Sequence, residues 1–246
     1  MRPDPSSWAW NVEALVAIPA LVAAYVLALR RYPAARWRIA SFAVAILLLL
    51  AVTVTPIETI ALNHLLSIHL LQNVVLAEWA PALLVLAVPP ALAARAPRVP
   101  PVPALILWLV NYGVWHLPWV YDAALRNPHT LLHLEHALYF LTGVLLWWPV
   151  VHGAHSAAFK SGYLFAAFVL ASPIGLLMAL IPEPIYDFYV GAPGELWGLS
   201  PLTDQQIAGV TMSLEQAAVF FAAFAFFFAR FLSEQDAADE PPAAAA

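Results

Sequence analysis

The chain has 246 residues and a net charge of −5; 63% of its residues are hydrophobic, only 10% are charged, and its mean hydropathy is +0.80. Soluble domains carry about 25% charged residues, so this composition excludes an ordinary soluble domain and predicts an integral membrane protein. The absence of cysteine excludes disulfides, iron–sulfur clusters and thiolate metal sites, and the acidic balance gives no sign of nucleic-acid binding.

Seven apolar stretches predict the fold class, an all-α integral membrane bundle of about seven transmembrane helices. In chain order they cover residues 10–29, 37–54, 60–88, 103–116, 127–151, 161–181 and 200–231. The third is longer than a bilayer of about 30 Å needs, so we expect it to tilt, to kink at Pro81 or to begin above the membrane surface. In the fifth, Asn127 is a suitable N-cap and Pro128 suits the first helical position.

The basic residues predict how these spans are oriented. With seven spans, eight of the ten fall on one side: Arg30, Arg31, Arg36, Arg38, Arg95, Arg98, Lys160 and Arg230. Only Arg2 and Arg126 fall on the other. Cytoplasmic loops carry the excess of lysine and arginine, so we expect the N-terminus outside and the C-terminus in the cytoplasm. The sequence thus predicts one membrane domain, residues 1–232, and a disordered cytoplasmic tail, residues 233–246.

Most of the histidines fall near the extracytoplasmic ends of the predicted spans. His129, His133 and His136 share one helix face, and residues of the third, fourth and seventh spans lie at a similar depth. Ionisable side chains inside a membrane are costly, and imidazole and thioether groups are suitable copper ligands. The candidate metal ligands are His69, His116, His133, His136, Met212 and Asp204. Binding through imidazoles should weaken as the pH falls through about 6.5.

Structural roles compete with this interpretation. A single histidine at the membrane boundary, such as His64 or His129, is more often a hydrogen-bonding residue than a ligand. Asp204 has the position of a helix cap, and Gln72 and Glu78 can join helices through hydrogen bonds. For His69, His133 and His136, convergence at one depth favours ligand binding.

Short motifs in a characteristic order extend over nearly the whole chain. They are Trp37-Arg38, Ser67-Ile68-His69-Leu70-Leu71-Gln72-Asn73, Trp115-His116-Leu117-Pro118, Tyr121-Asp122, His133-Leu134-Glu135-His136, Trp147-Trp148-Pro149, and Leu202-Thr203-Asp204-Gln205-Gln206 with Ala208-Gly209 and Met212. In this order and spacing the chain resembles the polytopic cytochrome c oxidase assembly factors of the CtaG type. The resemblance implies a non-enzymatic factor of the bacterial cytoplasmic membrane that acts on cytochrome c oxidase subunits and supports copper insertion on the extracytoplasmic side.

The chain departs from this family at the third span. Family members usually have a His-Met-x-x-His pattern there, whereas this chain has Leu70 at the methionine position and Asn73 at the second histidine position. The tryptophan that usually follows the methionine of the seventh span is Ser213. We therefore expect either a site rebuilt from His69, His116, His133 and His136, or a scaffolding role without metal.

Two other functions stay open. Two of the histidines could ligate haem in a membrane cytochrome, or Asp204, Glu215, Glu78 and the histidines could form the relay of a proton-coupled transporter. The transporter lacks support from internal repeats. No nucleophile–base pair or catalytic metal motif has a recognisable spacing, so we do not expect an enzyme.

Overall fold

The computed structural model describes residues 3–191 and 196–239, and all regular structure in them is helical. The helices are α1 (Val12–Arg31), α2 (Arg36–Val54), α3 (Pro56–Asn63), α4 (Leu66–Val74), the π-helix η1 (Val75–Trp79), α5 (Ala80–Ala87), α6 (Pro90–Ala93), α7 (Pro101–Trp115), α8 (Pro118–Arg126), the π-helix η2 (Pro128–Leu132), α9 (His133–Val151), α10 (Ala157–Leu180), α11 (Asp187–Val190), the 3₁₀ helix η3 (Leu196–Gly198) and α12 (Pro201–Asp239).

The predicted fold class is confirmed. Six helical segments in the described residues are long and apolar enough to cross a membrane, with α4, η1 and α5 forming one segment and η2 and α9 another. The helix at the expected fourth span, α7, is apolar but has only 15 residues. At 1.5 Å per residue it is about 22 Å long, shorter than a hydrocarbon core of about 30 Å.

The third predicted span begins later than expected. Residues up to Asn63 form the separate helix α3, the chain is non-helical at His64 and Leu65, and α4 begins at Leu66. The expected start near Ile60 was therefore wrong, since Ile60 belongs to α3. The expected disturbance at Pro81 takes the form of a π-helix that ends two residues before it. Proline has no N–H to donate to the carbonyl four residues earlier, which makes the regular α-helical pattern impossible there.

Two other boundaries differ from the expected ones. The fifth span does begin at Pro128, but the Asn127 side chain donates to the Ala123 carbonyl oxygen at 2.8 Å and does not cap the new helix. The last helix, α12, continues to Asp239, past Ser233, where the predicted disordered tail begins. Residues 240–246 of that tail lie outside the described residues.

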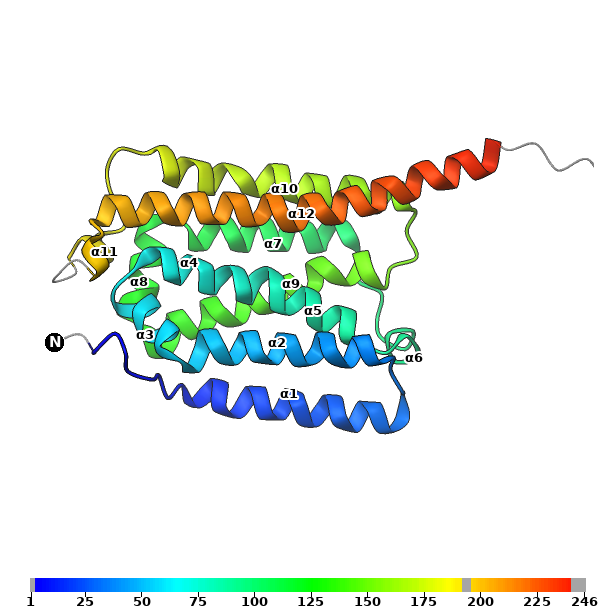
Figure 1. Cartoon of the computed structure of the whole chain (residues 1–246), viewed down its shortest axis with the longest axis horizontal. Helices are drawn as coiled ribbons and strands as arrows, with labels where there is room; N and C mark the ends of the chain where they lie inside the picture. Colours follow the sequence, from blue (N-terminus) through cyan, green and yellow to red (C-terminus); the bar gives the residue numbers. More distant parts are fainter. Residues whose placement is uncertain (1–2, 192–195, 240–246) are drawn as a thin grey trace, which may run out of the picture.

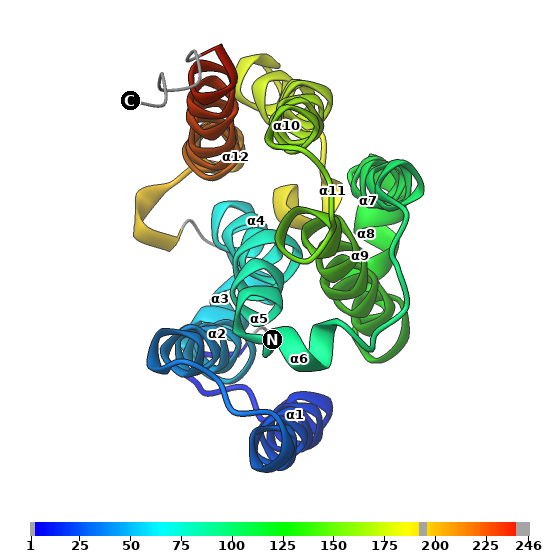
Figure 2. The ribbon, with the colours of Figure 1, turned by 90° about the vertical axis from the view of Figure 1, so that its right-hand side faces the viewer.

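The long helices run side by side, and the segment α4–η1–α5 lies in the middle of the bundle (Figures 1 and 2). In Figure 2, α2 and α1 lie on one side of it, α9 and α7 on a second, and α12 with α10 on a third. α10 and α12 approach closely at small residues: a Cβ at Gly209 would lie 2.5 Å from both the Ala179 nitrogen and the Gly175 oxygen. Small residues allow such close helix packing within a membrane.

The two ends of the bundle differ in chemistry. The α1–α2 connection and α6 lie at one end, together with the arginines of those segments, whereas α3, α8 and α11 lie at the other (Figure 1). Arg126 ends α8 at this second end, and Arg2 lies outside the described residues. The segregation of basic residues on which the predicted orientation depends is therefore present in the fold; which end faces the cytoplasm stays a prediction.

Candidate functional site

Buried polar side chains gather around the central segment α4–η1–α5 and the helices that cover it. They include Glu58, His69, Gln72, Asn73, Glu78, His116, Asp122, Glu135, Asp204, Gln205, Glu215 and Gln216. Such groups are costly in a membrane interior unless they find partners. Their hydrogen bonds, and the atoms left without any, therefore indicate what the site can bind.

His69 is fully buried on α4, and two tyrosines hold one side of its ring. Its Nδ1 atom lies 3.0 Å from the Tyr189 hydroxyl and 2.8 Å from the Tyr121 hydroxyl. The Tyr189 hydroxyl donates its own proton to the Ala61 carbonyl oxygen at 2.6 Å, whereas the Tyr121 hydroxyl can either donate to Nδ1 or accept from it. The other ring nitrogen, Nε2, is buried and has no hydrogen-bond partner.

His116 follows α7 and has the same arrangement. Its Nδ1 atom lies 2.8 Å from the Tyr112 carbonyl oxygen, which can only accept, so Nδ1 carries the proton. Its Nε2 atom is buried and has no partner. His116 is buried, and a charged ring is costly to place away from water. The neutral ring is therefore held with its lone pair free, which is the state that a metal ligand requires.

His136 on α9 lies beside His69. The two ring centroids are 6.0 Å apart and the rings meet edge to face. The Nε2 atom of His136 is also buried without a partner. Three of the predicted ligands, from three different helical segments, thus share one feature: an imidazole nitrogen in the interior with no hydrogen-bond partner.

Met212 of α12 lies at an internal cavity close to His116. The cavity has a volume of about 10 Å³, room for roughly one water molecule. Leu70 and Asn73, the two positions where this chain departs from the family pattern, line it together with Met212 and His116. The two residues that depart from the family pattern therefore lie at the same cavity as two of the predicted ligands.

His133 lies elsewhere, although it is only three residues from His136. Together with His129, Glu58 and the N-terminal segment it lines a groove of about 430 Å³ at the α3 end of the bundle. Burial raises the pKa of Glu58 in this groove to about 8, despite hydrogen bonds from Gln72 and Asn11 that oppose the rise. The grouping of His133 with the other histidines in one pocket stays a prediction.

Asp204 caps a helix from a distance. From the first turn of α12, its Oδ2 accepts from the Leu66 backbone N–H at 2.6 Å, and its Oδ1 accepts from the Ser67 N–H at 3.2 Å and the Ser67 hydroxyl at 2.5 Å. The N-terminus of α4, which follows the break at His64 and Leu65, thus receives its capping oxygens from another helix. Both carboxylate oxygens are used, and the helix that they cap is α4, not the start of α12 where Asp204 itself lies.

The described residues contain no group of three or more histidine, aspartate or glutamate side chains placed together to hold a metal ion. The structure brings His69 to His136 and His116 to Met212, and it places His133 at the groove and Asp204 at the cap of α4. It adds residues that we did not predict as part of the site: Tyr121 and Tyr189, which orient His69, and Glu135, which accepts from the Asn73 side chain at 3.1 Å. The two tyrosines lie on α8 and α11, and only the tertiary contact reveals them.

The helical bundle and its interior define the class of protein, a multi-pass membrane protein with a buried polar core. The family model described as "Cytochrome c oxidase caa3 assembly factor (Caa3_CtaG)" matches residues 21–234. The chain therefore belongs to the cytochrome c oxidase caa3 assembly factor family, and its role is in the assembly of that oxidase. No curated protein and no solved structure matches the chain.

Proposed function

We propose that the protein supports copper insertion into cytochrome c oxidase, with copper held as a transient cargo in the buried histidine layer. The observation that carries the proposal is the set of Nε2 atoms of His69, His116 and His136, all buried and without hydrogen-bond partners. A buried nitrogen without a partner is destabilising, and a bound metal ion would satisfy it. Imidazole suits copper, and the nearby thioether of Met212 favours Cu(I).

These ligands are not all placed around one point, and this fits a carrier that must release its ion. Two imidazoles lie beside each other, and a third lies at the cavity with Met212. Side-chain movements would be needed to bring all of them to one ion. A fully formed site would bind copper more tightly and release it more slowly, which would hinder delivery to the oxidase.

The orientation belongs to the same proposal. With the basic end in the cytoplasm, the end with α3, α8 and α11 faces outside, and the histidine layer is reached from there. The groove lined by His129 and His133 opens at this end and gives an entry side for the ion. The protein then acts as a non-enzymatic carrier: it binds and transfers an ion without changing a covalent bond.

A second candidate is a scaffold that binds no metal. It is favoured by Leu70 and Asn73, since neither leucine nor an asparagine that donates to Glu135 supplies a good copper ligand. A haem-binding function receives no such support at His116 and Met212. The cavity beside His116 is about 10 Å³, whereas cofactor pockets measure about 300–1,000 Å³.

The test is copper binding by the purified protein and by a His69→Ala/His136→Ala variant, measured by competition with a Cu(I) chelator. We expect binding by the wild type and a loss of at least tenfold in affinity in the variant. His155→Ala is the matched control, since His155 is exposed at the opposite, basic end. Copper-free wild-type protein that still restores the oxidase in a deletion strain would overturn the carrier and favour the scaffold.

A further inference from the structure

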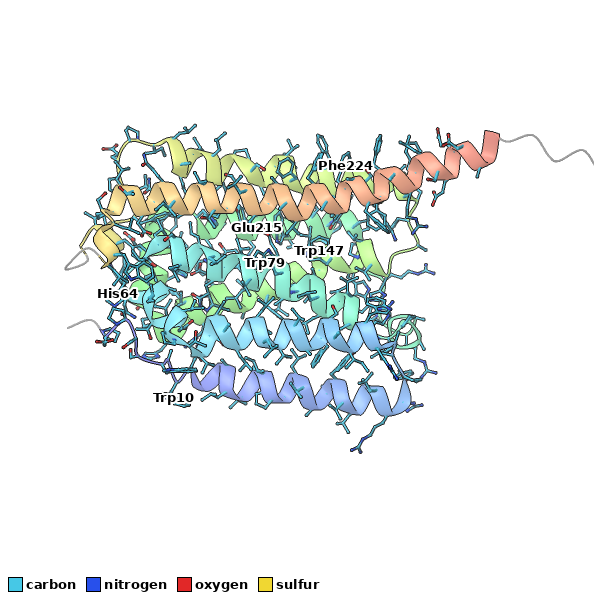
Figure 3. The ribbon with its side chains drawn as sticks, viewed as in Figure 1. Trp10, His64, Trp79, Trp147, Glu215 and Phe224 are labelled. Atoms are coloured by element: carbon cyan, nitrogen blue, oxygen red, sulfur yellow. The ribbon has the colours of Figure 1, made fainter. Side chains whose placement is uncertain are left out.

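Two glutamates meet in the middle of the bundle, and one of them, Glu78, lines the same cavity as His116 and Met212. Glu78 lies in η1, near the centre of the central span, and Glu215 lies in α12. Glu78 is fully buried and Glu215 is 8% exposed. Figure 3 shows Glu215 and Trp79 next to each other near the middle of the molecule, well away from His64 at the α3 end. A carboxylate at this depth is expensive to ionise.

The two carboxyl groups lie within hydrogen-bonding reach of each other. Glu215 Oε1 accepts from the Trp79 indole N–H, and Glu78 Oε1 accepts from the Gln216 amide at 3.5 Å. The same amide nitrogen donates to the Tyr112 hydroxyl at 2.9 Å. Side chains from η1, α7 and α12 therefore form one connected polar cluster.

This cluster has too few hydrogen atoms for its acceptors. Glu78 Oε2, Glu215 Oε2 and the side-chain oxygen of the fully buried Gln216 all lack a donor. In the described part of the chain, neither glutamate forms an ion pair with a basic side chain. Two adjacent ionised carboxylates without a counter-charge repel strongly in a low-dielectric interior. One proton placed between them removes the repulsion and supplies the missing donor.

We propose that Glu78 and Glu215 form a single proton-binding site in the membrane interior, in which one proton is shared between the two carboxyl groups. The titratable groups that face the pair from neighbouring elements are Tyr112 on α7, Tyr139 on α9 and His116, which lines the same cavity as Glu78. The two tyrosines are neutral phenols at physiological pH, and His116 is the neutral imidazole described above, so none of them replaces the proton as a counter-charge.

The shared proton also joins two parts of the fold. Glu78 belongs to the central segment and Glu215 to α12, which packs closely on α10. With the proton present, the pair is a hydrogen bond across the contact between α12 and the central segment. Without it, two negative charges face each other at the same contact. The protonation of the pair therefore determines whether α12 is attracted to the central segment or repelled from it.

The test is infrared difference spectroscopy of the purified full-length protein at neutral pH, which detects the C=O stretch of protonated carboxyl groups. Exposed carboxyl groups ionise near pH 4 and do not contribute. Glu58, whose pKa burial raises to about 8, also contributes, so the component of the pair is the part of the band that its variants remove. We expect a protonated band that Glu78→Gln and Glu215→Gln each remove completely. A shared proton gives this result because the new amide donates to the remaining carboxylate. Glu135→Gln, at another buried glutamate, and Glu234→Gln, on the exposed end of α12, are the controls that leave this component unchanged.

Two results would overturn the proposal. If each single variant removes half of the band and the double variant removes all of it, the two groups are separate acids with a proton each. If the wild type has no such component at neutral pH, or loses it when sodium or potassium is added, the pair is ionised or holds a metal cation. The absence of any protonated band in the wild type decides this second point, even where a variant fails to fold.

Discussion

Two membrane segments of nearly equal hydropathy occupy opposite positions in this protein. The central span, residues 66–87, has a mean hydropathy of 1.6, and 72% of the residues in its apolar stretch are buried in the protein. Residues 14–31 of α1 have a mean hydropathy of 1.7, but only 6% of them are buried. In a soluble protein, apolar composition marks the side that is buried. In a bilayer it does not, because lipid solvates an apolar helix as well as protein does.

The difference between the two segments lies in their polar residues. The central span contains His69, Gln72, Asn73 and Glu78, all buried, whereas the polar residues of α1 lie at its ends. Costly groups can be placed only where other helices satisfy them. Polar residues are therefore the better guide to the interior of this bundle, and the predictions below test the contrast between central and lipid-facing positions.

The largest effect is expected at Gly143 of α9, which packs directly against the central span. A Cβ there would collide with the Ala77 carbonyl oxygen and would lie 2.8 Å from Pro81 Cγ. Gly143→Ala should lower the free energy of unfolding by about 3 kcal/mol or more, since backbone blocks the added methyl group. Gly162→Ala is the matched change, because no atom of the described residues lies within 4 Å of the added Cβ. The higher helix propensity of alanine should raise the free energy of unfolding of this variant by as much as about 1 kcal/mol. Thermal unfolding in detergent measures both, and equal effects would contradict the packing.

Removal of the cap that α12 supplies to the central span should have the next largest effect. Asp204→Ala leaves the Leu66 and Ser67 donors without partners and should cost about 2–3 kcal/mol. Asp187→Ala, at an exposed residue of α11, should change the unfolding free energy by no more than about 0.5 kcal/mol. Chemical unfolding in detergent compares the two variants. An Asp204→Ala protein as stable as the control would show that the cap contributes little.

Stability should also fall as the pH rises, because of Glu58. Burial raises its pKa from 4.5 to about 8, so the folded protein holds a proton between these pH values that the unfolded chain releases. The stabilisation is complete below about pH 4.5 and is lost as the pH rises toward 8, with a slope of at most about 1.4 kcal/mol per pH unit. Glu58→Gln should flatten this slope in pH-dependent unfolding, whereas Glu183→Gln, in an exposed loop, should leave it unchanged. A wild-type profile that is flat from pH 5 to 8 would refute this account of Glu58.

The two departures from the family pattern give a prediction about copper. Leu70→Met together with Asn73→His places a thioether and an imidazole at the cavity that His116 and Met212 line. Affinity for Cu(I) should rise about tenfold or more, about 1.4 kcal/mol. Val16→Met with Ala20→His, on the exposed side of α1, is the matched control and should not change affinity. No gain over that control would argue against a metal site at the cavity.

The smallest effect is expected when the affinity for copper is measured at decreasing pH. The sequence predicts weaker binding below about pH 6.5, the usual range of histidine. Since His116 is buried, a charged ring would be costly there, and the ring stays neutral to a more acidic pH than an exposed histidine does. Affinity should therefore change less than about tenfold between pH 7 and pH 5.5. A steep decline through pH 6.5 would contradict a site made of buried imidazoles.

Much of the fold could be read from the sequence because apolar length and basic residues are local signals. The break after Asn63 could not, because residues 60–88 are continuously apolar enough for a helix and the cap of α4 comes from Asp204, far along the chain. The candidate site was predicted in part. Helical spacing places His133 and His136 on one face, but it does not tell which neighbouring element each ring meets. His136 meets His69, and His133 meets the groove near the N-terminus.

The central claim is that the buried histidine layer carries copper, and the most direct measurement is the copper content of the wild-type protein and the His69→Ala/His136→Ala variant after purification from copper-supplied cells. The account predicts stoichiometric copper in the wild type, little in the variant, and wild-type content in His155→Ala. Equal copper in all three proteins, or none in the wild type while oxidase assembly still depends on it, would contradict the claim.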